Sequence, residues 1–219
     1  MQVFKSLYGC AERNVKPVTL ELGGKSSLII FDDADIDSAV SGAMMANFFS
    51  QGQVCTNASK VLVHRSLVDE FVTRLREKTS AMRVGDPLEE ETKVGAHISR
   101  QHMDNVKKYI DGYEEIFGAV LLVIPFDTDD EAIDMANDTT MGLAAGLFTK
   151  DLAKAYRVVD RLHAGNVYVN TFNDVSPFVP FGGYDDSGFG RENGIAAIEH
   201  YTQIKSVFVS TAAKLPNPF

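Results

Sequence analysis

Short apolar runs alternate with helical patterns along most of the chain, and this alternation limits the folds that it can adopt. Brief runs rich in β-branched and other apolar side chains predict strands. Several segments between them carry apolar residues at helical spacing, which predicts helices with one buried face. Strands that alternate with helices usually form parallel sheets with helical crossovers. We therefore expect an α/β fold with a twisted, mainly parallel sheet and helices on both faces.

The run "AVLLVIPF" (119–126) is continuously apolar, which is typical of a strand buried on both faces of a parallel sheet. The first helix is predicted to begin after Asp35, because aspartate commonly caps the start of a helix. A weak boundary falls near 175–200, where Gly, Pro and Asp become frequent. In full, the predicted strands cover residues 26–31, 60–64, 119–126, 143–149, 166–170 and 205–210, and further helices cover 66–82, 129–138 and 151–163.

The net charge of the chain bears on which kinds of molecule it can bind. Its 219 residues carry a formal net charge of −9, and no Lys/Arg cluster interleaves with aromatic residues. This argues against binding to nucleic acid or to an anionic membrane surface. No apolar run approaches the roughly 20 residues that span a bilayer. The start of the chain does not read as a secretory signal, and two cysteines make no disulfide framework, so we expect a cytoplasmic protein.

One cysteine stands in a polar stretch between an apolar helical run and an apolar strand, in "FFSQGQVCTNASK" (48–60). A solitary cysteine is often an inert, buried small hydrophobe. The small or polar neighbours Gln53, Thr56 and Asn57 instead predict a loop, where reactive groups are commonly displayed. A reactive thiolate also needs a nearby base or a positive potential. Cys55 is therefore a candidate nucleophile, with an inert cysteine as the alternative.

A second candidate group lies in "VTLELGGKS" (18–26), where leucines flank Glu21 just before Gly23 and Gly24. Two glycines can turn the chain sharply and let a ligand approach the backbone. A carboxylate is costly to bury, so Glu21 either pairs with a cation or works as a tuned base. The stretch is not a phosphate-binding P-loop, because Thr19 stands where that motif requires glycine.

The stretch "PFGGYDDSGFGRE" (180–192) combines four glycines with aromatic residues. It is either a flexible surface turn or a loop folded over a ligand. Its glycines have the wrong spacing for a dinucleotide-binding fingerprint. The five histidines show no metal-ligand spacing, so no metal site is predicted.

Together these stretches resemble the aldehyde dehydrogenase superfamily. "VTLELGGKS" is similar to the motif with the family's general base, and "FFSQGQVCTNASKVLVH" is similar to its catalytic-cysteine motif. Within the superfamily, the sequences of these motifs are most similar to those of the trimethylaminobutyraldehyde and betaine aldehyde dehydrogenases. Three further stretches follow in the family's order: "EEIFGAV" (114–120), "NDTTMGLAAGLFTKDLAKAYRV" (137–158) and "PFGGYDDSGFGREN" (180–193).

The resemblance implies a covalent mechanism on a small-molecule aldehyde, with cationic amino-aldehydes as the candidate substrates. Cys55 would attack the aldehyde, and the thiohemiacetal would give a hydride to NAD and leave a thioester. Glu21 would be the general base that activates water to hydrolyse this thioester. Phe181 matches an aromatic position in the substrate tunnel. Glu192 matches a second carboxylate along the proton route.

The resemblance also implies NAD as the cofactor. Glu115 and Phe117 match positions that hold the nicotinamide ribose and pack near its ring. Leu22 and Gly23, next to the general base, match further cofactor-binding positions.

The resemblance implies a catalytic domain over residues 1–204, internally shortened near 111–114, and an oligomerisation strand and tail over 205–219. The family's N-terminal coenzyme domain and its oxyanion-hole asparagine have no counterpart in the sequence. Two functions therefore stay open: an NAD-dependent enzyme that forms homo-oligomers, or a non-catalytic truncated protein that assembles with full-length subunits. A thiol hydrolase built on Cys55 is a third reading, but it lacks a convincing histidine partner.

Overall fold

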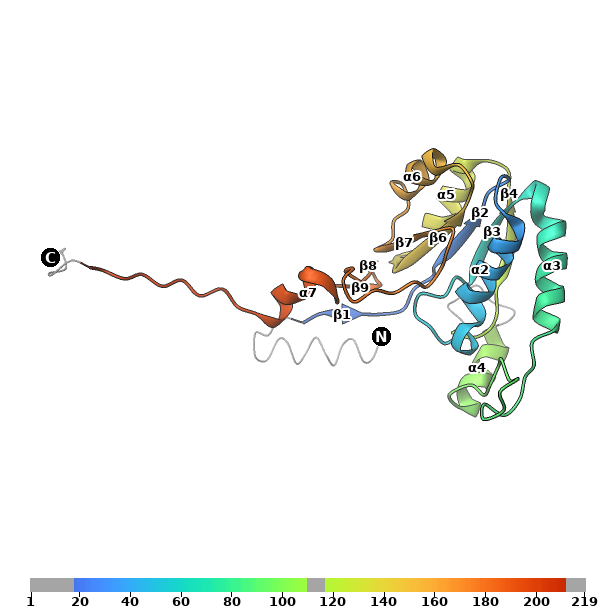
Figure 1. Cartoon of the computed structure of the whole chain (residues 1–219), viewed down its shortest axis with the longest axis horizontal. Coiled ribbons are helices and arrows are strands. Elements are labelled where there is room, and N and C mark those ends of the chain that lie inside the picture. The colour runs from blue at the N-terminus through green and yellow to red at the C-terminus, as the bar shows by residue number, and fades with distance from the viewer. Residues whose placement is uncertain (1–17, 110–116, 212–219) are drawn as a thin grey trace.

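The computed structural model describes residues 18–109 and 117–211, and its core is a five-stranded sheet (Figure 1). The strands lie in the order β4-β3-β2-β6-β7, and each neighbouring pair is parallel. The predicted α/β fold is thus confirmed. The strand bounds are β2 (Ser27–Ile30), β3 (Lys60–His64), β4 (Leu122–Phe126), β6 (Ala144–Phe148) and β7 (Asn166–Val169).

Helices cover both faces of this sheet (Figure 1). Leu28 and Ile30 of β2 pack with residues of α2 and α3 on one face, and Ile29 and Phe31 pack with residues of α5 and α6 on the other. All four side chains are fully buried, which explains why this segment is continuously apolar. The helices are α2 (Ile36–Phe48), α3 (Val68–Ser80), α4 (Arg100–Tyr109), α5 (Asp129–Asn137), α6 (Leu152–Val159) and α7 (Gly194–Tyr201).

Polar side chains fix the starts of three of these helices. Asp35 caps α2 by accepting a hydrogen bond from the backbone N–H of Ser38 at 2.9 Å, as its position in the sequence predicts. Thr128 caps α5, and Asp151 caps α6. Before α3 the chain makes a short 3-10 turn, η2 (Arg65–Leu67), so the helix predicted over 66–82 is shorter than expected.

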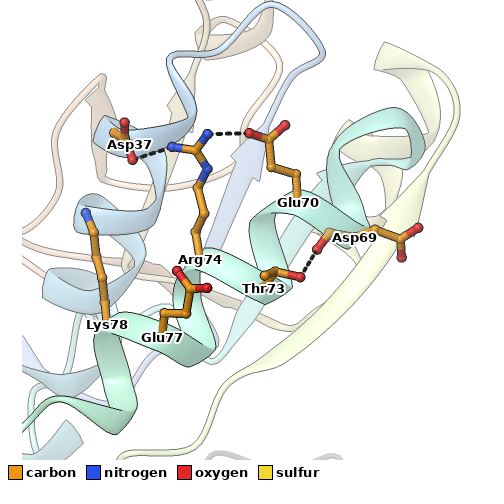
Figure 2. Close-up of a pocket in the computed structure, with 7 residues that line it drawn as sticks. All are labelled: Asp37, Asp69, Glu70, Thr73, Arg74, Glu77 and Lys78. Carbon is orange, nitrogen blue, oxygen red and sulfur yellow. Dashed lines mark hydrogen bonds and ion pairs between the residues drawn. The ribbon is translucent and has the colours of Figure 1, made fainter.

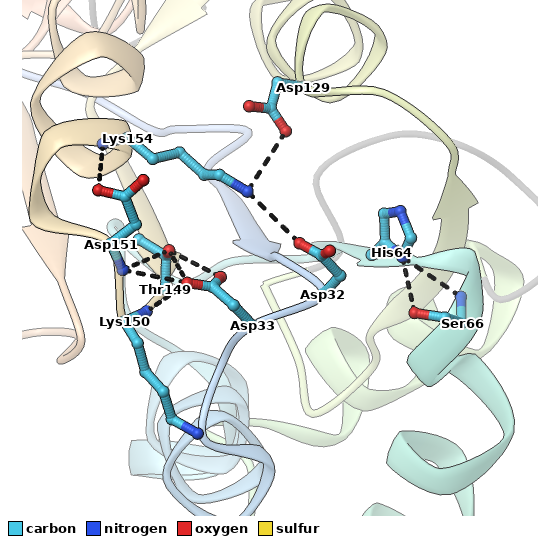
Figure 3. A network of polar contacts seen from close by, with 9 residues as sticks. All are labelled: Asp32, Asp33, His64, Ser66, Asp129, Thr149, Lys150, Asp151 and Lys154. Atoms are coloured by element: carbon cyan, nitrogen blue, oxygen red, sulfur yellow. Dashed lines mark hydrogen bonds and ion pairs between the residues drawn. The ribbon is translucent and has the colours of Figure 1, made fainter.

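A polar network ties together the carboxyl ends of β2 and β6 (Figure 3). Asp33 accepts hydrogen bonds from Thr149 Oγ1 at 2.7 Å and from the backbone N–H groups of Lys150 and Asp151 at 2.9 and 3.0 Å. Burial alone would raise the pKa of Asp33, but these hydrogen bonds favour the carboxylate, and its pKa lies below the usual value.

Strand β4 corrects one prediction from the sequence. The continuous apolar run 119–126 indicated a strand buried on both faces, but β4 begins only at Leu122 and forms an edge of the sheet. Leu122 is 43% exposed, and Pro125, which has no N–H to donate, is also exposed. Proline is acceptable at such an edge because its missing donor interrupts no ladder between two neighbours.

The segment 205–210 also differs from the prediction made from the sequence. It was predicted to be a strand, but residues 202–211 run as an extended, exposed chain that leads away from the sheet beyond α7 (Figure 1). Val207, Phe208 and Val209 are each more than 70% exposed. Within the described residues this segment pairs with no strand. A strand needs a neighbouring strand as well as apolar side chains, and among the described residues none pairs with this segment.

Two small antiparallel pairs lie beside the main sheet: β1 (Leu20–Glu21) with β9 (Gly188–Phe189), and β5 (Met141–Gly142) with β8 (Tyr184–Asp185). The first pair docks the glycine-rich stretch 180–192 onto the segment that holds Glu21, and the second docks it onto the segment before β6. In the described parts of the chain, no helix combines the length and the apolar character that crossing a membrane requires.

Candidate active site

Cys55 lies in a turn that leads from α2 to β3. After α2 ends at Phe48, the short turn η1 (Phe49–Gly52) takes the chain through left-handed backbone angles at Ser50, Gln51 and Gly52, with φ of 53°, 58° and 77°. Left-handed angles at non-glycine residues are strained and persist only where the surroundings impose them. Cys55 follows this turn and is half-buried.

Hydrogen bonds made by polar side chains hold residues 49–57, the segment that we call the cysteine turn. Asn57 Nδ2 donates to the carbonyl of Asn47, near the end of α2, at 3.1 Å. Thr56 Oγ1 donates to Asn173 Oδ1 at 2.6 Å, and Asn173 Nδ2 donates to Asn57 Oδ1 at 3.3 Å. Thr56 and Asn57 are both buried, so these hydrogen bonds are made largely away from water. The network fixes the residues that follow Cys55 directly.

Gly24 packs directly against the cysteine turn. A Cβ atom at Gly24 would lie only 2.9 Å from the carbonyl oxygen of Cys55, so a larger residue would push the two segments apart. The Glu21 motif and the Cys55 motif, predicted separately from the sequence, are therefore in contact through Gly24.

Glu21 itself lies in β1 and is exposed. Its pKa is raised above the usual value of 4.5, mainly by partial burial and then by the charge of Glu192, while Arg191 acts in the opposite direction. The sequence-predicted residues Phe181 and Glu192 lie opposite each other, and each donates its backbone N–H to the other's carbonyl at 2.8 Å. The structure thus brings Glu21 and Glu192 into electrostatic contact and fixes Phe181 beside Glu192.

The predicted cofactor-binding residues that the structure describes lie in two segments, each of which contacts residues 52–55 through a glycine, Gly24 in one and Gly118 in the other. Leu22 donates its N–H to the carbonyl of Ser187 at 3.0 Å, and Ser187 Oγ donates to the carbonyl of Gly23 at 2.7 Å. Phe117 is 38% exposed and precedes Gly118, which closely approaches Gly52 of the turn. Glu115 lies outside the described residues.

A cavity of about 360 Å³ lies next to this region. Its lining combines the aromatic side chains of Tyr168 and Phe181 with one carboxylate, that of Asp174. The pKa of Tyr168 is raised by burial first, and then by the charges of Asp174 and Cys55. A hydrogen bond links the cavity to the cysteine segment, because Thr56 bonds to Asn173, the neighbour of the lining residue Asp174. Sequence reasoning missed Tyr168, Asn173 and Asp174, because polar loop residues and a buried tyrosine carry no motif of their own.

A second, larger hollow of about 600 Å³ lies between α2 and α3 (Figure 2). Its lining is almost entirely charged, and Arg74 forms ion pairs with Asp37 and Glu70 there. Asp37 lies in the first turn of α2 and the other lining residues lie in α3, whereas Cys55 follows the C-terminal end of α2. Exposed ion pairs of this kind add little stability, and we assign this hollow no role in the site. In residues 18–109 and 117–211, no three histidine, cysteine or carboxylate side chains gather closely enough to hold a metal ion.

Comparison with known proteins identifies the family. The profile of the aldehyde dehydrogenase family matches residues 1–113 and 112–207, so the chain belongs to this family. It is 43% identical to betaine aldehyde dehydrogenase from Brucella anthropi over 98% of this chain and 52% of the relative. It is 44% identical to 4-trimethylaminobutyraldehyde dehydrogenase B from Danio rerio, over 94% of this chain and 48% of the relative.

Solved structures of the family share the fold. An NAD⁺ complex of betaine aldehyde dehydrogenase from Staphylococcus aureus superimposes with a TM-score of 0.92 at 33% identity, covering 100% of this chain and 52% of the other. An NAD⁺ complex of an aldehyde dehydrogenase from Bacillus cereus gives a TM-score of 0.90 at 35% identity, covering 95% and 50%.

The chain spans about half the length of the curated relatives that it matches. Its alignment with the Brucella relative extends over 256 positions, more than the 219 residues of the chain, so the relative carries internal positions with no counterpart here. The two family matches overlap at residues 112–113, which lie within the region 111–114 where a shortening was predicted.

Proposed function

We propose that this chain is the catalytic half of an NAD-dependent aldehyde dehydrogenase, with Cys55 as the nucleophile and Glu21 as the general base. The observation that carries the proposal is the packing of Gly24 on the carbonyl of Cys55, which joins the two motifs at one place in the fold. The half-buried position of Cys55 just after a strained turn supports the same assignment, since such strain is concentrated at functional sites.

The chemistry divides between the two residues. The Cys55 thiolate attacks the aldehyde carbon, and the backbone N–H of Cys55 stabilises the oxyanion that forms. Bound NAD would supply a hydride acceptor for this carbon, and loss of the hydride would leave a thioester on Cys55. Glu21 then takes a proton from the water that attacks the thioester, which releases the acid and restores the thiolate. The raised pKa of Glu21 suits this step, because a general base works best when its pKa lies near the working pH.

The described residues fit one end of the cofactor. Phe117 offers an exposed aromatic ring and precedes Gly118, which contacts Gly52, and Leu22 and Gly23 precede Gly24, which contacts the carbonyl of Cys55. Apolar and aromatic side chains of this kind suit the flat nicotinamide ring. The relatives are about twice as long as this chain, and we propose that polypeptide outside the matched half holds the adenosine half of NAD.

For the substrate we propose an aldehyde with a cationic group. The relatives named for betaine aldehyde and 4-trimethylaminobutyraldehyde motivate this class. The cavity supports it, because Asp174 supplies a negative charge and Phe181 supplies an aromatic face for an ammonium group.

The substrate class is tested by comparing kcat/KM for 4-trimethylaminobutyraldehyde with that for an uncharged aldehyde of similar length. Because Asp174 is exposed, replacing it with asparagine should reduce the preference for the cation by only about twofold to fivefold. Equal kcat/KM values for the two aldehydes in the unmutated protein would remove this proposal.

The alternative function is a non-catalytic partner of full-length subunits. Large apolar side chains of α7 and the tail favour it, because Ile195, Tyr201 and Phe208 are each at least 75% exposed. A surface of this kind commonly marks a contact with another polypeptide.

One experiment separates the two functions. NADH formation is measured at saturating NAD for the purified chain alone and for the chain co-purified with the N-terminal half of a family member, with Cys55→Ser as the blank. We expect no turnover above the blank for the chain alone, and Cys55-dependent turnover for the complex. Turnover by the chain alone would remove the partner function. A folded complex without turnover would remove the catalytic proposal.

A further inference from the structure

Phe117 has an unusual backbone conformation for a large residue. Its φ is +47°, in the left-handed region, where a residue other than glycine is strained. Strain of this kind persists only where surrounding contacts impose it. The ring of Phe117 is 38% exposed, so burial of the side chain is too incomplete to be the whole explanation. A specific contact to the backbone is needed.

Helix α4 makes that contact. His102 Nε2 lies 2.8 Å from the carbonyl oxygen of Phe117, and since a carbonyl only accepts, the imidazole donates from Nε2. The two rings also pack nearly perpendicular, with centroids 6.2 Å apart. One turn further along α4, Val106 covers Gly118 so closely that a Cβ there would lie 2.9 Å from its methyl carbons. Residues 117 and 118 are thus held by one face of α4.

The segment just before α4 also reaches the cysteine turn. Gln53 Oε1 accepts a hydrogen bond from the backbone N–H of Ile98 at 2.9 Å, and Gln53 Nε2 donates to the carbonyl of Ser50 at 3.3 Å. Gly52, between these two residues, lies against Gly118, because a Cβ on it would come within 2.1 Å of the Gly118 carbonyl carbon. Residues 98–106 therefore contact both the cysteine turn and the Phe117 segment, which also contact each other.

We propose that His102 is a positioning residue that holds Phe117 against the cysteine turn. By fixing the Phe117 backbone, His102 determines where an aromatic face is presented beside Cys55. The consequence for the nicotinamide end of NAD rests on the proposed function, whereas the positioning itself does not. His102 acts through Phe117 and not on the reacting atoms.

The test uses the full chain without aldehyde or NAD, so its failure is distinct from failure of the proposed function. The rate of Cys55 alkylation by iodoacetamide is measured across a range of pH, together with amide hydrogen exchange of residues 117–120. His102→Leu removes the donor, and His102→Gln keeps a nitrogen donor close to the position of Nε2. His102→Ala replaces the leucine variant if leucine impairs folding.

We expect the loss of the donor to release the Phe117 segment, to speed its amide exchange, and to raise Cys55 alkylation by about threefold or more. The glutamine variant should stay near the unmutated protein, and the pH midpoint of alkylation should not move. His97→Leu is the matched control, because the His97 ring is 5.9 Å from that of His102 and its Nε2 makes no hydrogen bond to the described residues.

Three results would overturn the proposal. The first is unchanged alkylation and exchange when the His102 donor is lost. The second is an equal effect of the glutamine variant or of His97→Leu, which would assign the effect to general packing in this segment. The third is a shift of the pH midpoint with unchanged amide exchange, which would mean that His102 acts on the thiol through its charge.

Discussion

Thr56 and Asn173 are 117 positions apart in the sequence, yet Thr56 Oγ1 donates a 2.6 Å hydrogen bond to Asn173 Oδ1. This contact connects the residue next to Cys55 with the segment that carries Asp174 and, further on, Phe181. Asn173 also has a left-handed backbone, with φ of 61°. One residue therefore combines a strained backbone with the contact that links the cysteine turn to the nearby cavity.

Replacing Asn173 should separate these two contributions. Asn173→Ala loses the hydrogen bonds and keeps the strain, so the free energy of unfolding should fall by about 1–3 kcal/mol. Asn173→Gly loses the same hydrogen bonds but accepts the left-handed angle, and should be about 1 kcal/mol more stable than the alanine variant. Urea unfolding of the three proteins measures both differences. Equal stability of the alanine and glycine variants would show that the backbone strain is negligible.

Asp33 should contribute stability that depends on pH. Its folded-state pKa lies below the unfolded value near 3.8, so its contribution is present above that value and is lost as the pH falls through the lowered pKa. Asp33→Asn should therefore destabilise the chain by about 1–3 kcal/mol at neutral pH and by much less in strong acid. Thermal unfolding of both proteins across this acid range gives the comparison. A difference that does not shrink in acid would contradict the assigned hydrogen bonds.

Ionisation of Glu21 should lower the stability of the folded chain as the pH rises, which is opposite to the effect of Asp33. Its folded-state pKa is raised, so the folded chain binds the proton more tightly than the unfolded chain does, and stability falls as the pH rises from about 4.5 through the raised value. Glu21→Gln removes both this ionisation and the repulsion from Glu192. The variant should gain thermal stability relative to the unmutated protein at neutral pH, and this gain should disappear in acid. Glu192→Gln is the matched control and should give part of the same gain.

Much of the fold could be predicted from the sequence, because the strands of the sheet interior must be apolar on both faces. Strand β2 shows this, since Leu28 to Phe31 alternate between two separate cores and every one is buried. The edge strand β4 was wrongly predicted as buried, because an apolar run does not reveal how many neighbours the strand will have. Helices α4 and α7 were not predicted.

The candidate site was predicted in part. Cys55 and Glu21 belong to recognisable motifs, and their shared contact through Gly24 agrees with one site, although their catalytic roles stay predictions. Asn173 and Asp174 were missed, because their importance comes from contacts with residues more than a hundred positions away, such as Thr56. A single sequence carries no local signal for such contacts, apart from the general tendency of asparagine to adopt left-handed angles.

The tail should mediate association. Val207, Phe208 and Val209 are exposed on an extended segment, and such a segment can add to the sheet edge of another subunit. Deleting residues 205–219 should lower the apparent mass measured by light scattering. The substitution Val207→Lys in the 219-residue chain disturbs the segment less than the deletion does, and it should also lower the apparent mass. An unchanged mass in both variants would argue against this role of residues 205–219.

The most direct test of the central claim is the relative reactivity of the two cysteines. Iodoacetamide is added in limiting amount to the folded chain, and mass spectrometry maps the labelled thiol, with Cys55→Ser as the control. Because Cys55 follows a strained, partly exposed turn that is typical of a displayed nucleophile, it should be labelled several-fold faster than Cys10, and an added aldehyde should slow its labelling. Equal labelling of the two thiols, or faster labelling of Cys10, would contradict the assignment of Cys55 as the nucleophile.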